Sequence, residues 1–272
     1  MKWLAPVFLA PVFFAAAAPV AADAVPPARL DDLPPADVIL LGEVHDNPRH
    51  HENQARAVAA LKPKALVFEM LTPAQADLVT PQARQSSDAL AVATGWATSG
   101  WPDFSLYWPI FAAAPEAAIL GAGVTREDMA GLREKGAAAL FGPEAHRFAL
   151  DRPLPAEAQQ AAEEEQRLAH CDMLPGDLLP MMVDAQRLRD AALARATLRA
   201  LEAHGPPVVV IAGSAHVRAG AVPAMLKTAA PDLRVISVGQ VEEGAAVQQP
   251  FDLWIVTPPE PRDDPCASLR KP

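Results

Sequence analysis

The stretch 37-DVILLGEVHDNPRHH-51 contains the end of an apolar run and the start of a polar helix. Its first part, 37–42, is rich in Val, Ile and Leu without alternation, which is typical of a strand covered on both faces. Asn47 followed by Pro48 then predicts the beginning of a helix, because Asn is a good N-cap and proline suits the first helical position. A buried strand that leads directly into a helix indicates an α/β fold.

Apolar runs of the same kind recur along the chain, and most of the segments between them have helical patterns. Strand, helix and strand in this order predict a parallel sheet with right-handed crossovers. We therefore predict an α/β fold in which a parallel β-sheet is flanked by helices. The expected strands lie in 37–42, 65–70, 117–123, 207–214, 233–239 and 251–257.

Two of the intervals between strands, 71–116 and 124–206, are too long for single crossovers. Both are rich in helical patterns, so we expect them to pack together as a smaller all-helical subdomain inserted around the third strand. Residues 259–272 are a Pro-rich tail whose only anchor would be Cys266. The sheet core then comprises 36–72, 115–125 and 206–258, and the helical subdomain comprises about 73–114 and 126–205.

The first 22 residues predict a signal peptide. A single Lys2 precedes a short apolar segment that prolines interrupt, and the small residues Val20 and Ala22 stand before Asp23. We expect cleavage there rather than retention as a membrane anchor, which leaves a mature chain of residues 23–272 that is periplasmic or secreted. No cysteine lies at the cleavage position, which argues against a lipid anchor.

Composition excludes some partners of the mature chain. The formal net charge of −10 argues against a nucleic-acid partner, and no mature segment is long and apolar enough to span a membrane. Cys171 and Cys266 would reach an oxidising compartment, where a disulfide is permitted. The sequence does not show whether the two cysteines are close, so their pairing stays open.

Polar side chains follow three of the predicted strands. Glu43 and His45 follow the first, Glu69 ends the second, and Ser214 and His216 follow the fourth in a repeat of Gly-x-x-His. The carboxyl ends of parallel strands meet at one edge of a sheet, and glycine lets the backbone turn tightly there, so we expect one shared crevice. Its side chains would bind a divalent metal or act as acid and base. Alternatively, the glutamates cap helices and the histidines satisfy buried backbone groups.

Aromatic residues gather in 96-WATSGWPDFSLYWPIF-111, which includes the chain's only tyrosine, Tyr107. The face that helical spacing predicts consists of Trp101, Phe104, Trp108 and Phe111. This face is either core packing or the wall of a flat apolar cofactor such as haem, for which tyrosine is a known axial ligand.

Six blocks in this order resemble the ChaN family of haem-binding, iron-regulated bacterial proteins. They are GEVHDNPRHH at 42–51, FEM at 68–70, YWP at 107–109, HCDMLP at 170–175, AQRLRD at 185–190 and GSAHVRAG at 213–220. The resemblance implies an exported protein of haem or iron uptake, with a parallel sheet and a small helical domain. The chain departs from the family's common pattern in having no lipidation cysteine.

For the site, the resemblance implies haem bound between two monomers, and so a haem-dependent homodimer. Tyr107 would ligate the iron, and Trp101, Phe104 and Trp108 would form the pocket wall. The propionates would be held by a His and a Lys of the other monomer, for which His170 and Lys135 are the choices. An outer-membrane haem receptor is a further partner that this role admits.

The same superfamily includes erythromycin esterase-like hydrolases and metal-dependent proteases, which resemble the chain at the paired Glu and His positions. The rival hypothesis is an exported hydrolase with Glu43 or Glu69 as base, and with His45 and His216 positioning water or a metal. The two hypotheses use different residues, and we expect Tyr107 to lie outside the Glu/His crevice.

Overall fold

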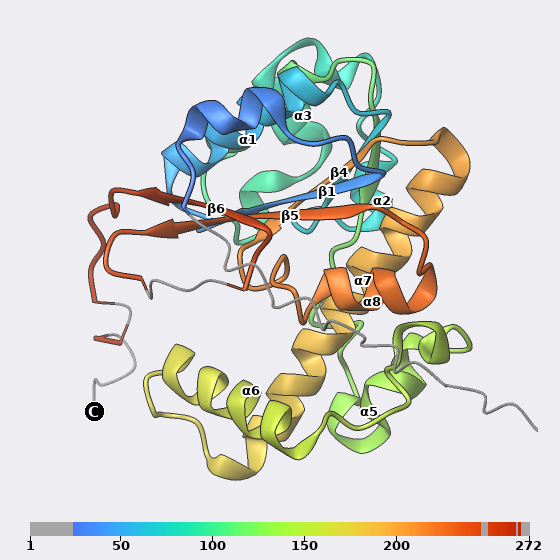
Figure 1. Cartoon of the computed structure of the whole chain (residues 1–272), viewed down its shortest axis with the longest axis vertical. Helices are drawn as coiled ribbons and strands as arrows, with labels where there is room; N and C mark the ends of the chain where they lie inside the picture. The colour runs from blue at the N-terminus through green and yellow to red at the C-terminus, as the bar shows by residue number, and fades with distance from the viewer. Residues whose placement is uncertain (1–23, 246–249, 265, 268–272) are drawn as a thin grey trace, which may run out of the picture.

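The computed structural model describes residues 24–245, 250–264, 266 and 267. It confirms the α/β prediction, because it contains a six-stranded parallel sheet in the order β3-β2-β4-β1-β5-β6 (Figure 1). Every strand overlaps one of the predicted apolar runs. The predicted signal peptide lies outside the described residues. The strands are β1 (Val38–Glu43), β2 (Ala65–Phe68), β3 (Ala118–Gly121), β4 (Val208–Gly213), β5 (Val235–Glu242) and β6 (Leu253–Thr257).

Helices make up most of the connections between the strands. The first begins as predicted, because the Asn47 side chain accepts a hydrogen bond from the Arg49 backbone N–H and Pro48 lies in the first turn. The helices of the described part are α1 (Pro48–Leu61), α2 (Pro73–Ala76), α3 (Ser87–Ala93), α4 (Phe104–Ala113), α5 (Leu132–Phe141), α6 (Ala156–Ala169), α7 (Leu179–His204) and α8 (Val222–Ala229). Short 3-10 helices are η1 (Pro27–Asp32), η2 (Ala83–Gln85), η3 (Trp96–Thr98), η4 (Ala145–Phe148) and η5 (Gly176–Leu178).

Each face of the sheet has its own apolar core. Ile39 and Leu41 of β1 face a core formed with η1, α1, α3 and α4. Val38 and Leu40, which alternate with them, face a second core formed with α5, α7 and α8. In Figure 1, α1 and α3 lie on one side of the sheet and α7 and α8 on the other. The sheet is therefore buried on both faces, as its unbroken apolar strands predicted.

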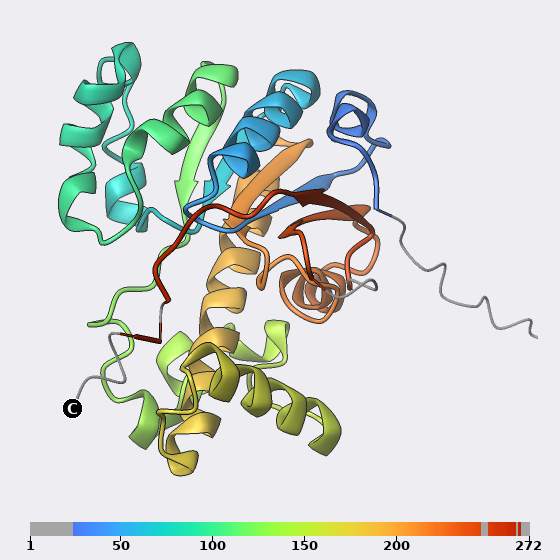
Figure 2. The ribbon, with the colours of Figure 1, turned by 90° about the vertical axis from the view of Figure 1, so that its left-hand side faces the viewer.

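The prediction that 73–114 packs with 126–205 in one subdomain is wrong. Helix α4 instead covers the sheet beside α1, and Phe111 stacks on Phe68 of β2 with ring centroids 4.4 Å apart. The aromatic residues of this interval supply the apolar surface that the sheet face needs. Helices α5 and α6 lie beyond the sheet, and α7 runs from them back to it (Figure 2).

A disulfide between Cys171 and Cys266 joins the end of α6 to the C-terminal tail, which answers the question of pairing that the sequence left open. Arg262 of the tail also pairs with Asp46 and Glu242. The ion pairs of Arg262 therefore hold the tail in addition to Cys266, which was the only anchor that we predicted. Among the described residues, no helix has the length and apolar character needed to cross a bilayer.

Candidate functional site

Two neighbouring strands, β1 and β4, send the chain to opposite faces of the sheet. Helix α1, which follows β1, belongs to one core, and α8, which follows β4, belongs to the other. Such a reversal leaves a crevice at the carboxyl ends of the two strands. Glu43, His45, Glu69 and His216 lie at this end of the sheet.

Glu43 and Glu69 point to opposite faces of the sheet. Alternate residues of a strand point to the same face, so Glu43 points with Ile39 and Leu41 toward α1 and α4. By the same rule, Glu69 points with Val67 toward α7. The crevice therefore has two halves. The first half consists of Glu43, His45, His51 and Tyr107, and the second half consists of Glu69, Asp190 and His216.

A buried carboxylate orients His45 in the first half. Glu43 Oε1 lies 2.8 Å from His45 Nδ1, and the Glu43 side chain is fully buried. Because a carboxylate only accepts, His45 carries a proton on Nδ1 and its other nitrogen, Nε2, faces the space beside Gly213. Burial lowers the pKa of His45, but the hydrogen bond to Glu43 and the charge of Glu69 outweigh it, so the pKa is raised. With 35% of its side chain exposed, His45 is the accessible acid–base group.

The repeated glycines serve close packing, so the expectation that they turn the backbone is wrong. Gly42 lies inside β1 and Gly213 inside β4, both outside the left-handed region. A Cβ atom on Gly42 would lie 2.7 Å from Ser214 Oγ, and one on Gly213 would lie 3.0 Å from His45 Nε2. Any larger residue would push the crevice side chains apart.

Tyr107 belongs to the first half of the crevice, contrary to our expectation of two separate sites. Its fully buried hydroxyl donates to Glu43 Oε1 at 2.9 Å, and its ring lies 4.4 Å from that of His51. The reason is that α4 covers the face to which Glu43 points. Burial, and then the charge and hydrogen bond of Glu43, raise the pKa of Tyr107, so the phenol is a neutral donor here.

His51 packs against Glu43 without a hydrogen bond to it. His51 Nε2 lies 2.8 Å from the His45 carbonyl oxygen, which only accepts, so this nitrogen carries the ring proton. His51 Nδ1 then faces Glu43 Oε2 at 3.4 Å, and neither atom has a hydrogen-bond partner in the described part of the chain. The two side chains are therefore in close polar contact without a hydrogen bond between them.

In the second half, His216 is held between two carboxylates. Its Nε2 lies 3.2 Å from Glu69 Oε1 and its Nδ1 lies 2.6 Å from Asp190 Oδ1. Burial lowers the pKa of His216, but Glu69 and Asp190 outweigh it and raise the pKa to about 10. Burial raises the pKa of Glu69, but His216 and His45 reverse this and lower it to about 2. His216 is therefore a fixed cation, and Glu69 is its ionised partner.

These donors do not fit a divalent metal. Both nitrogens of His216 face carboxylates, and one nitrogen of His45 faces Glu43. In the described ranges, no three His, Cys, Asp or Glu side chains come together as a metal-binding group. The donors are already paired with one another.

The predicted haem wall divides between the crevice mouth and the core. Trp101 is half-buried, and its ring lies 4.8 Å from His45 in an edge-on contact. Phe104 is buried against Trp96, with centroids 5.0 Å apart, and Trp108 packs on the same core while remaining partly exposed. Only Trp101 thus lies beside an accessible polar group.

The two predicted propionate ligands lie in the helical part of the chain. Lys135 is exposed on α5. His170 follows α6, and its Nδ1 lies 2.8 Å from the Gln166 carbonyl oxygen. Neither forms a hydrogen bond or ion pair with a crevice residue in the ranges that the structure describes. Their predicted role toward a second monomer remains a prediction.

Sequence reasoning missed His51, Asp190 and the neighbouring Gln186, whose side-chain nitrogen lies 3.1 Å from His216 Nδ1. Asp190 is buried in a long, alanine-rich helix. An acidic residue among apolar helix positions was the sequence feature that could have indicated it. A buried carboxylate needs a partner, so the position of Asp190 indicated a polar contact. Its partner still depended on where α7 crosses the sheet.

The comparison with a solved ChaN structure agrees with this architecture. ChaN of Campylobacter jejuni, solved as "Cofacial heme binding to ChaN of Campylobacter jejuni", matches 80% of this chain and 86% of its own, with 20% identity and a TM-score of 0.61. The type III effector HopBA1 matches 82% of this chain and 88% of its own, with 14% identity and a TM-score of 0.43. No curated protein matches the chain.

The family comparison covers most of the chain, including both halves of the crevice and α4. The matching family model is described as "Haem-binding uptake, Tiki superfamily, ChaN", and it spans residues 29–226. This range contains the blocks on which the resemblance rested. The chain belongs to the ChaN family of haem-binding uptake proteins in the Tiki superfamily.

Proposed function

We propose that this chain binds haem. The observation that carries the proposal is the family match over residues 29–226. The fold shared with the haem-binding ChaN of Campylobacter jejuni supports it. In this proposal the mature chain is exported and takes part in haem or iron uptake.

Two side chains of the crevice compete as the iron ligand. Tyr107 is the ligand that the family resemblance implies, but as folded it does not fit, because its buried oxygen is bonded to Glu43. His45 does fit, because its side chain is 35% exposed, its Nε2 forms no hydrogen bond in the described ranges, and its ring lies beside the flat ring of Trp101. Imidazole is also a common axial ligand of haem iron. We propose His45 as the ligand of this folded state, and Tyr107 as a ligand that only a displaced α4 would offer.

The haem-bridged homodimer is the second part of the proposal. Lys135 is exposed and His170 is half-buried, so a second monomer can reach both from outside. They would hold the propionates of haem bound in the partner. An outer-membrane haem receptor would then exchange haem with the dimer.

Titration of ferric haem into the purified mature chain tests the proposal by absorbance. His45→Gln should change the spectrum of the bound haem, whereas Tyr107→Phe should keep it. His146→Gln, at an exposed histidine outside the crevice, is the matched control. Loss of a phenolate charge-transfer band in Tyr107→Phe alone would transfer the ligand role to Tyr107, and absence of saturable binding would refute haem binding. Sedimentation should show monomer without haem and dimer with it.

A second candidate function is hydrolysis, which the Glu43–His45 geometry favours. A carboxylate that orients an imidazole whose other nitrogen has no hydrogen-bond partner in the described ranges is the arrangement of a general base. His45 Nε2 would take a proton from water, the water oxygen would attack a carbonyl carbon, and the proton would pass to the leaving group. Glu43 would stabilise the imidazolium between these steps.

Hydrolysis of p-nitrophenyl acetate by the haem-free chain tests this second function. Loss of a general base costs about 10²-fold or more in rate, so we expect such a decrease in His45→Gln and none in His146→Gln. Equal rates in all three proteins would eliminate His45 as a base. Because the assay contains no haem, its outcome is independent of the haem titration.

A further inference from the structure

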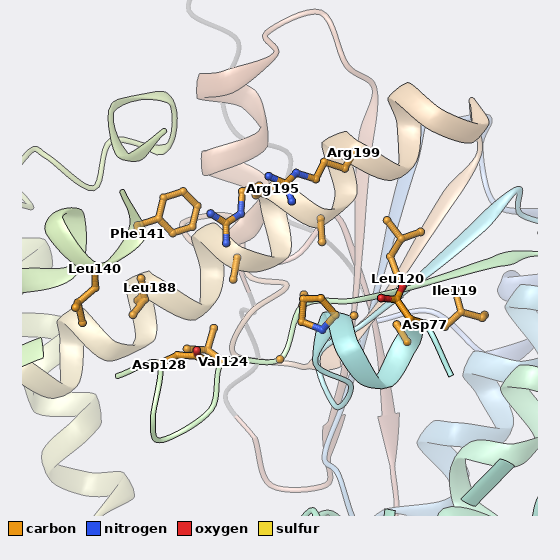
Figure 3. Close-up of a pocket in the computed structure, with 17 residues that line it drawn as sticks. Asp77, Ile119, Leu120, Val124, Asp128, Leu140, Phe141, Leu188, Arg195 and Arg199 are labelled. Atoms are coloured by element: carbon orange, nitrogen blue, oxygen red, sulfur yellow. The ribbon is translucent and has the colours of Figure 1, made fainter. Parts of the chain in front are cut away.

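A cavity of about 450 Å³ lies between the edge strand β3 and helices α5 and α7 (Figure 3). None of the residues that line it belongs to either half of the crevice. Its volume is in the range of sites that bind small molecules. The cavity is therefore a separate place on the fold where a ligand fits.

Two arginines of α7 line this cavity. Arg195 and Arg199 are four residues apart, so they project from the same side of the helix, as Figure 3 shows. Arg195 is half-buried, and its guanidinium carbon lies 4.1 Å from the centroid of the Phe141 ring. It has no hydrogen-bond or ion-pair partner in the ranges described. Arg199, whose side chain is 65% exposed, is 3.5 Å from Glu144.

The two guanidinium groups repel each other, because like charges one helical turn apart destabilise a helix. Burial, and then the charge of Arg199, lower the pKa of Arg195. The Arg195 side chain offers five N–H donors in a planar fork, and such a fork pairs with both oxygens of a carboxylate. An anion next to Arg195 would relieve the repulsion and satisfy these donors.

The remaining wall of the cavity decides which anions fit. Its apolar part includes Leu120, Val124, Leu140, Phe141 and Leu188. Asp77 and Asp128 also line it, and these carboxylates disfavour ligands with several negative charges. We propose that the cavity binds a small amphipathic carboxylate, with its single anionic group on Arg195 and Arg199 and its apolar body against β3 and α5.

Calorimetric titration of the purified mature chain with octanoate tests this proposal. We expect saturable binding of octanoate, at least tenfold weaker binding of acetate, and none of octylamine. These differences follow because acetate lacks the apolar body and octylamine has the opposite charge. Octylamine binding as tightly as octanoate, or no octanoate binding at all, would overturn the proposal. Equal affinity for acetate would reduce the site to one for a simple anion and would overturn the ligand class.

Variants then locate the binding. Arg195→Gln should weaken octanoate at least tenfold, and Arg195→Lys should weaken it less, because charge is kept and only the fork is lost. Arg133→Gln, at an exposed α5 arginine paired with Asp177, is the matched control and should bind like the parent. Unchanged affinity in Arg195→Gln would overturn the assignment. If that variant does not fold, Arg199→Gln is used in its place, with the same expected direction.

Discussion

The two halves of the crevice use the same residue types for opposite purposes. In the second half, His216 has a carboxylate at each nitrogen, so it is a fixed cation inside the protein. In the first half, His45 has a carboxylate at only one nitrogen and presents the other to the crevice. The comparison teaches that the number of carboxylates around an imidazole separates a structural ion pair from an available acid–base group. The predictions below test this difference.

The largest effect should follow from Glu69→Gln. Removing one partner of a buried ion pair leaves an uncompensated charge, which typically costs about 3–5 kcal/mol. Because Asp190 remains beside His216, we expect a decrease of about 3 kcal/mol in the free energy of unfolding, measured by urea denaturation. Asp190→Asn is the companion variant and should cost less, because burial raises the pKa of Asp190. A loss below about 1 kcal/mol for Glu69→Gln would show that the second half is not an ion pair.

The pH dependence of stability should separate His216 from His50, a neutral buried histidine of α1. His216 has a pKa raised from 6.5 to about 10, so its contribution is complete below pH 6.5 and is lost as pH rises toward 10. His50 has a pKa lowered by burial from 6.5 to about 4, so stability is lost as pH falls from 6.5 toward 4. Glu69 adds a loss below pH 4.5, toward its lowered pKa of about 2.

Urea denaturation at a series of pH values measures these slopes. His216→Gln should remove the decline above pH 6.5 and keep the one below it, whereas His50→Gln should do the reverse. If the free energy of unfolding falls equally above pH 6.5 in the parent and in His216→Gln, His216 is not a fixed cation.

A smaller effect is expected for Tyr107→Phe, which removes one donor from Glu43 in the first half. A hydrogen bond to a charged group contributes about 1.5–3 kcal/mol, and His45 remains as the other donor, so we expect a loss of about 2 kcal/mol. The pKa of His45, followed by NMR, should rise further because Glu43 loses a stabilising donor. An unchanged His45 titration would mean that Tyr107 and His45 are not coupled through Glu43.

Much of this architecture was readable in the sequence. Unbroken apolar runs predicted the strands, because a sheet buried on both faces needs no alternation. The strand ends predicted that Glu43, His45, Glu69 and His216 lie near one another, because parallel strands end at one edge. The sequence did not show which helix covers which face, since that depends on the strand order. For this reason the joining of Tyr107 to Glu43 was missed.

The disulfide gives the molecule a closed covalent ring. Helices α5 and α6 connect to the sheet through α7, and Cys171–Cys266 provides a second route through the tail to β6. From Thr257 to Cys266 the tail spans at most about 30 Å when fully extended. Beyond Arg262, which is paired with Asp46, only about 13 Å remains. If α7 bends, the tail therefore allows α5 and α6 to move only a short distance relative to the sheet. Reduction of the Cys171–Cys266 disulfide would remove this limit.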